Sequence, residues 1–232
     1  SKGEYPVVIA SAGNSGPDAE TIGQPAGGEE VIAVAAATKG EDANNPSKSA
    51  KLEISLYSSA GWAWSSHGYG LTRPILKPEI TGEVGTVNTP DEKGDVYKYG
   101  LTSPRSKDAE ASPSDSADGL ETRAAGTSMS APQAAGAAAL VKKALKNVAD
   151  KVTGWVWENL PFSVKMLLMV SAEDMRAPVQ KMGAGLMDYG AAVKAAGGDL
   201  SWIADARKAV DLPRSVFEAA GAMRASATTA RS

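Results

Sequence analysis

One serine of this chain stands where a nucleophile could work: Ser128, in the stretch AAGTSMSAPQAAG (124–136). A hydroxyl is a weak nucleophile near neutral pH, so it needs an adjacent base, a fixed exposed position and donors for the oxyanion that its attack creates. Gly126 permits an unusual backbone turn, and the small residues after Ser128 predict a helix whose free N–H groups and positive dipole end face an anion. The N–H of Ser128 is then a natural oxyanion donor.

The hydroxyl groups around Ser128 could also have a purely structural role, and the sequence offers few candidates for a catalytic base. Serine and threonine are preferred helix caps, so Thr127, Ser128 or Ser130 could simply cap the helix. The sequence holds a single histidine, His67. Loop bracing or solvation is its ordinary interpretation, and a serine hydrolase that recruits it is the alternative, because triads are recognised by geometry rather than by order.

Composition excludes several classes of protein. The 232 residues, 43% of them apolar, suffice for a buried core. A net charge of −3, from 24 basic and 27 acidic residues, offers no broad cationic surface and argues against a nucleic-acid partner. The absence of cysteine excludes disulfides and thiolate metal sites but leaves the compartment open. No apolar run approaches the roughly 20 residues of a membrane span, so none is expected.

The elements that would position Ser128 follow an α/β pattern. Two short apolar runs without polar alternation, 6–10 and 31–37, predict parallel strands covered on both faces. The alternating run 51–58 predicts a half-exposed strand. A helix is predicted over 132–147, where proline occupies the first turn, alanine dominates and lysines gather in the last turns. Further helices are predicted at 153–160, 163–171 and 189–196.

Two irregular segments interrupt this pattern. The aromatic stretch 58–70 predicts an ordered surface loop, which either packs on the protein or contacts a peptide or partner. Residues 88–122, rich in Pro, Ser, Asp and Gly, predict an inserted excursion whose carboxylates lack calcium-loop spacing. The chain therefore divides into 1–198, which includes this polar insertion, and an amphipathic helical tail at 199–232 whose end is expected to be frayed or disordered.

Two motifs together resemble the subtilisin-like serine proteases (subtilases, peptidase S8). GTSMSAP at 126–132 is similar to the family's nucleophile motif, and VVIASAGNSG at 7–16 to the strand and turn that carry its oxyanion asparagine. Further similar segments follow in the family's order: TIGQPAGGEEVIAVAAAT, LYSSAG, LKPEITGEV and MGAGLMDYGAAVKA. The resemblance covers about residues 7–196. It implies an α/β subtilisin-like three-layer fold with a mainly parallel sheet, of which this chain is the C-terminal portion, plus the small helical tail.

The resemblance implies a role for each candidate site residue. Ser128 would be the nucleophile of a serine endopeptidase, Asn14 would donate its side-chain NH₂ to the oxyanion, and Thr127 would help to bind substrate. Residues near the substrate pocket would be Ser11, Ala12, Gly13 and, less directly, Gly23. Met129 would be an oxidation-sensitive neighbour. Taken alone, Asn14 is ordinary turn chemistry, and simple packing is the alternative for the pocket residues.

The resemblance also shows a departure. In the family the catalytic Asp and His precede the oxyanion asparagine, whereas this sequence begins at about Asn14, without a methionine. We therefore expect a fragment, inactive alone, whose partners are a peptide or protein substrate and a missing N-terminal portion that supplies Asp and His. No cofactor or metal is required for the chemistry; structural calcium and an extracellular location are family expectations only. The alternative is a non-catalytic protease-like binding or assembly module.

Overall fold

The computed structural model describes most of the chain between residues 6 and 200. The described residues are 6–39, 52–66, 72–85, 100–112, 115–148, 159–198 and 200. His67, most of the helix predicted at 153–160 and the tail at 199–232 lie outside them, apart from residues 159, 160 and 200. Of the tail, Leu200 is described, and it packs in the main core. The predicted division into 1–198 and a tail therefore stays a prediction.

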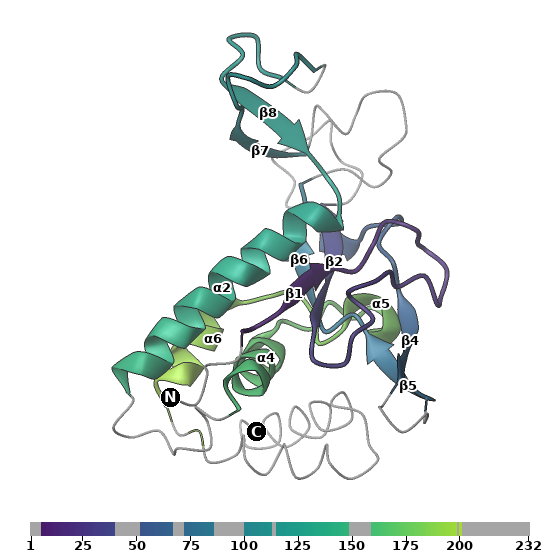
Figure 1. The fold of residues 1–232 in the computed structure, drawn as a ribbon, viewed down its shortest axis with the longest axis vertical. Helices are drawn as coiled ribbons and strands as arrows, with labels where there is room; N and C mark the ends of the chain where they lie inside the picture. Colours follow the sequence, from purple (N-terminus) through teal and green to yellow (C-terminus); the bar gives the residue numbers. More distant parts are fainter. Residues whose placement is uncertain are drawn as a thin grey trace.

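A four-stranded mixed sheet lies at the centre of the described residues (Figure 1). Its middle strand is β2 (Ile32–Lys39), which runs parallel to β1 (Ile9–Ser11) and to β6 (Ile80–Glu83), whereas β3 (Leu52–Ile54) pairs with it in the antiparallel direction. Val34 pairs with both Ser11 and Ile80, so β1 and β6 flank β2 on opposite sides. β1, β2 and β6 are parallel; the apolar runs at 6–10 and 31–37 predict this for β1 and β2, and β3 makes the sheet mixed.

The unbroken apolar sequence of β2 follows from burial on both of its faces. Ile32 and Val34 point toward the helices and belong to the main core. Ala33, between them, packs against Ala10 and Ala26 on the other face. Because successive side chains alternate between the faces of a sheet, a strand covered on both sides needs apolar residues at every position.

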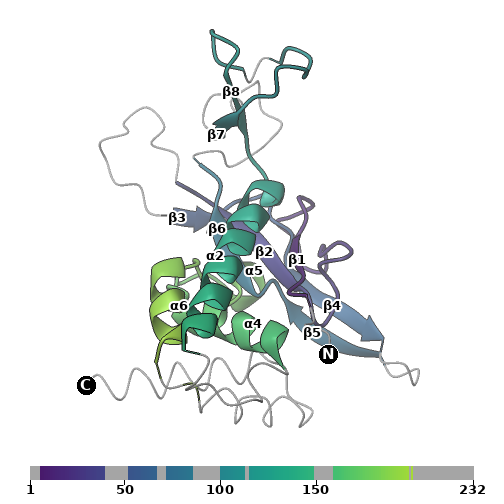
Figure 2. The same cartoon turned by 60° about the vertical axis from the view of Figure 1, so that its left-hand side comes forward.

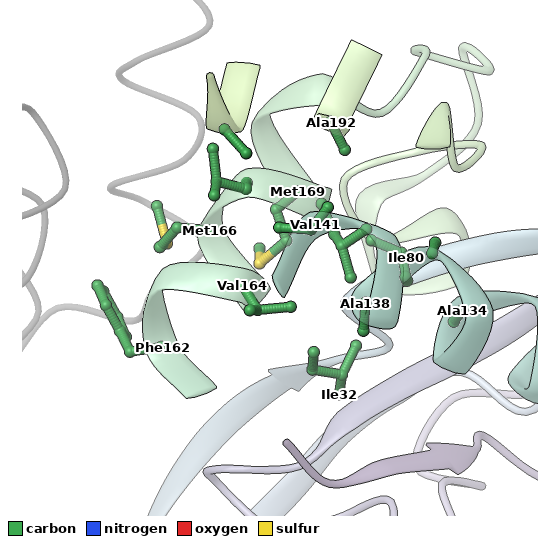
Figure 3. Packing of buried hydrophobic residues seen from close by; sticks show 14 of the residues in the cluster. Ile32, Ile80, Ala134, Ala138, Val141, Phe162, Val164, Met166, Met169 and Ala192 are labelled. Carbon is green, nitrogen blue, oxygen red and sulfur yellow. The ribbon is translucent and has the colours of Figure 1, made fainter. Parts of the chain in front are cut away.

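Three helices cover one face of the sheet. The helix α2 (Thr127–Asn147) packs on β1, β2 and β6, and α4 (Leu160–Ser171) and α6 (Tyr189–Ala196) pack on α2 (Figures 1 and 2). Small side chains such as Ala134 and Ala138 let α2 approach the sheet closely, and the rest of this core includes Ile32, Ile80 and the apolar side of α4 (Figure 3). The predictions at 163–171 and 189–196 are confirmed. The helix predicted from residue 132 begins earlier, at Thr127, and includes Pro132 in its first turns.

A loop that includes Ala26 packs on the other face of the sheet, and a hairpin forms a separate two-stranded sheet. The hairpin joins β4 (Gly61–Ser66) to β5 (Thr72–Lys77), and the short helix α5 (Val179–Met182) contacts both strands. The expectation of a surface loop over 58–70 is therefore wrong for residues 61–66. Trp62 and Trp64 are exposed while Ala63 is buried, the alternation of a strand with one covered face. The predicted three-layer arrangement is met in part, because among the described residues the helical layer is well formed on one face only.

A second hairpin projects from the end of α2 that carries Ser128. It pairs β7 (Leu101–Pro104) with β8 (Glu121–Ala124) in antiparallel register and leads directly into α2 (Figures 1 and 2). An ion pair between Arg105 Nε and Asp115 Oδ2, 2.7 Å apart, ties its outer part together. The polar insertion expected at 88–122 thus contains a hairpin in its described part. No described helix is both long enough and apolar enough to cross a membrane.

Candidate functional site

Two hydrogen bonds join Asn14 to Thr127, although 113 positions separate them in the sequence. The backbone N–H of Thr127 donates to Asn14 Oδ1 over 3.0 Å, and its hydroxyl Oγ1 donates to the same oxygen over 2.9 Å. An N–H can only donate, so the side-chain atom that it meets must be the amide oxygen. The NH₂ end of Asn14 is therefore left to donate elsewhere.

The turn before Ser128 depends on Gly126. This residue is the N-cap of α2 with φ 134° and ψ 163°, a backbone conformation that side-chain-bearing residues rarely adopt. A Cβ at Gly126 would lie 3.2 Å from Asn14 Nδ2. Glycine thus provides both the turn and the room for the asparagine amide beside it. Ser128 lies in the first turn of α2 rather than just before the helix, and it is exposed.

Two donors at this helix end have no acceptor among the described residues. The N–H of Thr127 is taken by Asn14, and the N–H of Met129 donates to the carbonyl of Gly126 over 2.9 Å. The N–H of Ser128, between them, is one of the free donors that every helix N-terminus leaves. Asn14 Nδ2 is the other. A backbone N–H and a side-chain NH₂ at the same helix end are the kind of pair that stabilises an oxyanion.

Of the predicted pocket residues Ser11, Ala12 and Gly13, only Gly13 is hydrogen-bonded to this site. Ala12 is fully buried; its N–H donates to Val34 O and its carbonyl accepts from Gly23 N–H over 3.1 Å. Its methyl group therefore packs inside the protein. Ser11 is half-buried in β1, and Gly13 donates its N–H to Thr127 Oγ1 over 3.2 Å. The structure brings Gly13, Asn14 and Thr127 into one hydrogen-bonded group next to Ser128, whereas a role in substrate binding stays a prediction.

A buried tyrosine lies near Gly126 and Met129, and its place was not predicted from the sequence. Tyr57 packs with Ala36 and Val84, and Met129, the neighbour of Ser128, is half-buried against them. Its hydroxyl faces Ser55 and the backbone of Gly126 without making a full hydrogen bond to either. Burial raises the pKa of Tyr57, so the phenol stays neutral there. The motif LYSSAG alone does not indicate that its tyrosine is buried near Gly126 and Met129.

A buried charged cluster was also missed. Glu79 Oε1 accepts from Lys77 Nζ over 2.7 Å and from Lys165 Nζ over 2.6 Å, and the three residues are 3%, 1% and 4% exposed. Glu79 Oε2 accepts from the N–H of Ala33 over 2.7 Å, which ties the cluster to β2. Burial lowers the pKa of Lys77 to about 8, although Glu79 opposes the shift. A lysine within the apolar run FSVKMLLMV is the signal that could have revealed it.

No described side chain forms a hydrogen bond with the Ser128 hydroxyl, and no metal site is found among the described residues. The one histidine of the sequence lies outside them, so the alternative that recruits His67 stays untested. No group of three or more His, Asp or Glu side chains within the described ranges could hold a metal ion. Structural calcium remains an expectation from the resemblance.

Comparison with known proteins identifies the family. The model of the subtilase family, Peptidase S8, matches residues 2–189, most of the chain. The chain belongs to the subtilase family. The predicted resemblance is therefore confirmed, and with it a relation to serine hydrolases. The search of curated proteins found no match.

Solved structures of subtilisin-like proteases share this fold. A protease from Pseudoalteromonas arctica is 23% identical, with a TM-score of 0.52 over 82% of this chain and 42% of its own. A lanthipeptide protease is 20% identical, with a TM-score of 0.51 over 82% of this chain and 50% of its own. The subtilase chain thus spans about half the length of these two structures or less.

Proposed function

We propose that this chain is the C-terminal part of the catalytic domain of a serine endopeptidase, with Ser128 as the nucleophile. The observation that carries the proposal is the pairing of Asn14 with Thr127. Because Oδ1 of Asn14 accepts both hydrogen bonds, its NH₂ is held for donation beside the N–H of Ser128. A merely structural asparagine would gain nothing from having its donor end kept free at a helix N-terminus next to an exposed hydroxyl.

The proposed reaction proceeds in two halves. The Ser128 hydroxyl attacks the peptide carbonyl carbon while its proton passes to a base, and the carbonyl π pair moves onto oxygen. Asn14 Nδ2 and the Ser128 N–H would stabilise that oxyanion. The intermediate then collapses: the C–N bond breaks, the leaving amine takes the proton from the base, and an acyl-enzyme ester forms on Ser128. Water hydrolyses the ester in the same manner, which releases the acid and restores the hydroxyl.

The base and its orienting carboxylate would come from sequence outside this chain. Family members place Asp and His before the segment that matches this chain, and the chain spans about half the length of the structures that it resembles. Substrates would be peptides or proteins, bound near Gly13 and Thr127. No cofactor enters this chemistry, because nucleophile, base and oxyanion donors are all protein groups.

The test is peptide hydrolysis by a protein that contains this chain together with its upstream sequence. We expect cleavage of an unstructured protein substrate that disappears in Ser128→Ala. In Asn14→Ala the turnover should fall by about 10²–10³, a loss established on a related subtilisin and carried over from it. Asn147→Ala, which changes an exposed side chain at the opposite end of α2, serves as a control outside the oxyanion site. Peptide binding without cleavage would instead favour the binding or assembly module.

A further inference from the structure

The turn that carries Asn14 is held from behind by a second segment, residues 55–59, which we call the 55–59 bridge. The N–H of Ser15 donates to Ser59 Oγ over 3.1 Å. The N–H of Ser59 donates to Gly13 O, and the N–H of Gly16 donates to Tyr57 O, each over 2.9 Å. The backbone on both sides of Asn14 is thus bonded to one bridge, and its side chain is bonded to Thr127.

The bridge is itself anchored to the middle strand of the sheet. The N–H of Ala36 donates to Ser58 Oγ over 3.0 Å, and the carbonyl of Ala36 accepts from the N–H of Ser55 over 2.9 Å. Both hydrogen-bonding groups of one β2 residue are therefore used to fix the bridge. The Tyr57 ring also packs with Ala36 and touches the region of Met129. One support connects the sheet to the turn of Asn14 and to the first turn of α2.

The contact between turn and bridge leaves no room for a shift. A Cβ on Gly13 would lie 2.8 Å from Ser59 Oγ, and one on Gly16 would lie 2.2 Å from Ser58 O. Ser59 is fully buried, whereas Ser15, whose N–H it accepts, is exposed. The hydroxyl of a fully buried serine thus ties the N–H of an exposed loop residue to the protein interior.

We propose that Ser59 is a positioning residue for the oxyanion site. Its Oγ holds the N–H of Ser15, and this contact keeps Asn14 in register with Thr127, so that Asn14 Oδ1 stays on the Thr127 N–H. Ser59 touches neither the nucleophile nor a substrate carbonyl; it acts through the turn. Its predicted effect on turnover rests on the proposed function, whereas its predicted effect on the position of Asn14 does not.

Amide hydrogen exchange of the protein tests directly whether Ser59 keeps Asn14 in position against Thr127. In Ser59→Ala, faster exchange of the Ser15 N–H is trivial, because its acceptor is gone. The proposal predicts that the Thr127 N–H also loses protection, by about five- to tenfold, the effect of one hydrogen bond. Ser163→Ala is the matched control: Ser163 is equally buried and bonded, to Asn159 O, but lies on α4. It should leave the protection of Thr127 unchanged.

Several outcomes decide the proposal. Unchanged protection of Thr127 in Ser59→Ala, with Ser15 exchanging faster, would overturn it and leave Ser59 a local structural residue. If Ser59→Ala does not fold, wild-type exchange in rising urea replaces it: the Ser15 and Thr127 N–H groups should open with the same urea dependence, and independent opening would overturn the proposal.

Turnover provides a second readout that separates this proposal from the proposed function. In the longer protein, Ser59→Ala should lower kcat about as much as it lowers the protection of Thr127, with KM nearly unchanged, because the oxyanion forms only after substrate is bound. A rise in KM with kcat unchanged would contradict the positioning role. If the wild type cleaves nothing, the proposed function fails. The exchange result still shows whether Ser59 positions Asn14.

Discussion

Replacing Glu79 with Gln should destabilise this protein strongly. Glu79 is the one carboxylate between two buried lysines, which it meets at 2.7 and 2.6 Å. Glu79→Gln keeps the shape of the side chain but removes the carboxylate that contacts both Lys77 and Lys165, which are 1% and 4% exposed. Breaking a buried ion pair by removing one partner costs about 3–5 kcal/mol of unfolding free energy. That is about a fifth or more of the stability of a typical domain, which is about 5–15 kcal/mol.

Urea unfolding followed by circular dichroism measures this loss. With a denaturant slope of about 1–3 kcal/mol per M, the midpoint should fall by on the order of 2 M at pH 7. Lys165→Met is the matched control, because it removes one of two lysines and leaves the balanced pair of Lys77 with Glu79; we expect it to cost much less. At pH 9 the loss in Glu79→Gln should shrink, since Lys77, with a pKa of about 8, can then release its proton. A loss below about 1 kcal/mol at pH 7, or equal losses in both variants, would refute the reasoning.

Three further predictions concern the site and its surroundings. Thr127→Val removes a hydroxyl that accepts from Gly13 N–H and donates to Asn14 Oδ1, so turnover of the longer protein should fall by roughly fivefold, the effect of the one hydrogen bond lost at Asn14, in a kcat measurement; unchanged kcat would show that the Thr127 N–H alone suffices. Gly126→Ala forces a side chain into φ 134° beside Asn14, and should abolish labelling of the nucleophile in the longer protein while circular dichroism shows a folded chain. Because the pKa of Lys77 falls from 10.5 to about 8 on folding, unfolding takes up a proton between these values, and the wild type should gain stability from pH 8 to 10 relative to Lys77→Met; a relative loss would contradict the shift.

Much of the site could be predicted because its two halves carry specific motifs. GTSMSAP and SAGN lie far apart in the sequence, yet the structure joins Thr127 to Asn14 by two hydrogen bonds. The start of α2 was predicted too late because Pro132 suits a first turn. The structure begins the helix at Thr127, where Gly126 supplies the turn. Pro132 therefore lies inside the helix, where proline has no N–H to donate to the carbonyl four residues earlier.

The supports of the site could not be predicted from sequence alone. Serines such as Ser59 are common in surface turns, and nothing in LYSSAG tells a buried acceptor from an exposed hydroxyl. Charged residues are normally exposed, so Lys77 and Glu79 suggest a surface strand. Their burial depends on the ion pair that Glu79 also forms with Lys165 of α4, which is distant in sequence. The hairpin at β4 was missed because its alternation of Trp and Ala is interrupted by Gly and Ser at its ends. Each of these features depends on contacts between distant segments.

The most direct measurement is labelling of Ser128 by a fluorophosphonate probe, with the modified residue located by peptide mass spectrometry. It is carried out on this chain alone and on the protein that includes its upstream sequence. The account predicts that only the longer protein is labelled, at Ser128, and that Ser128→Ala abolishes the label. Absence of label in both would contradict a catalytic role for Ser128 and favour a binding or assembly module. Labelling of the short chain would show that its own residues, His67 first among them, supply the base.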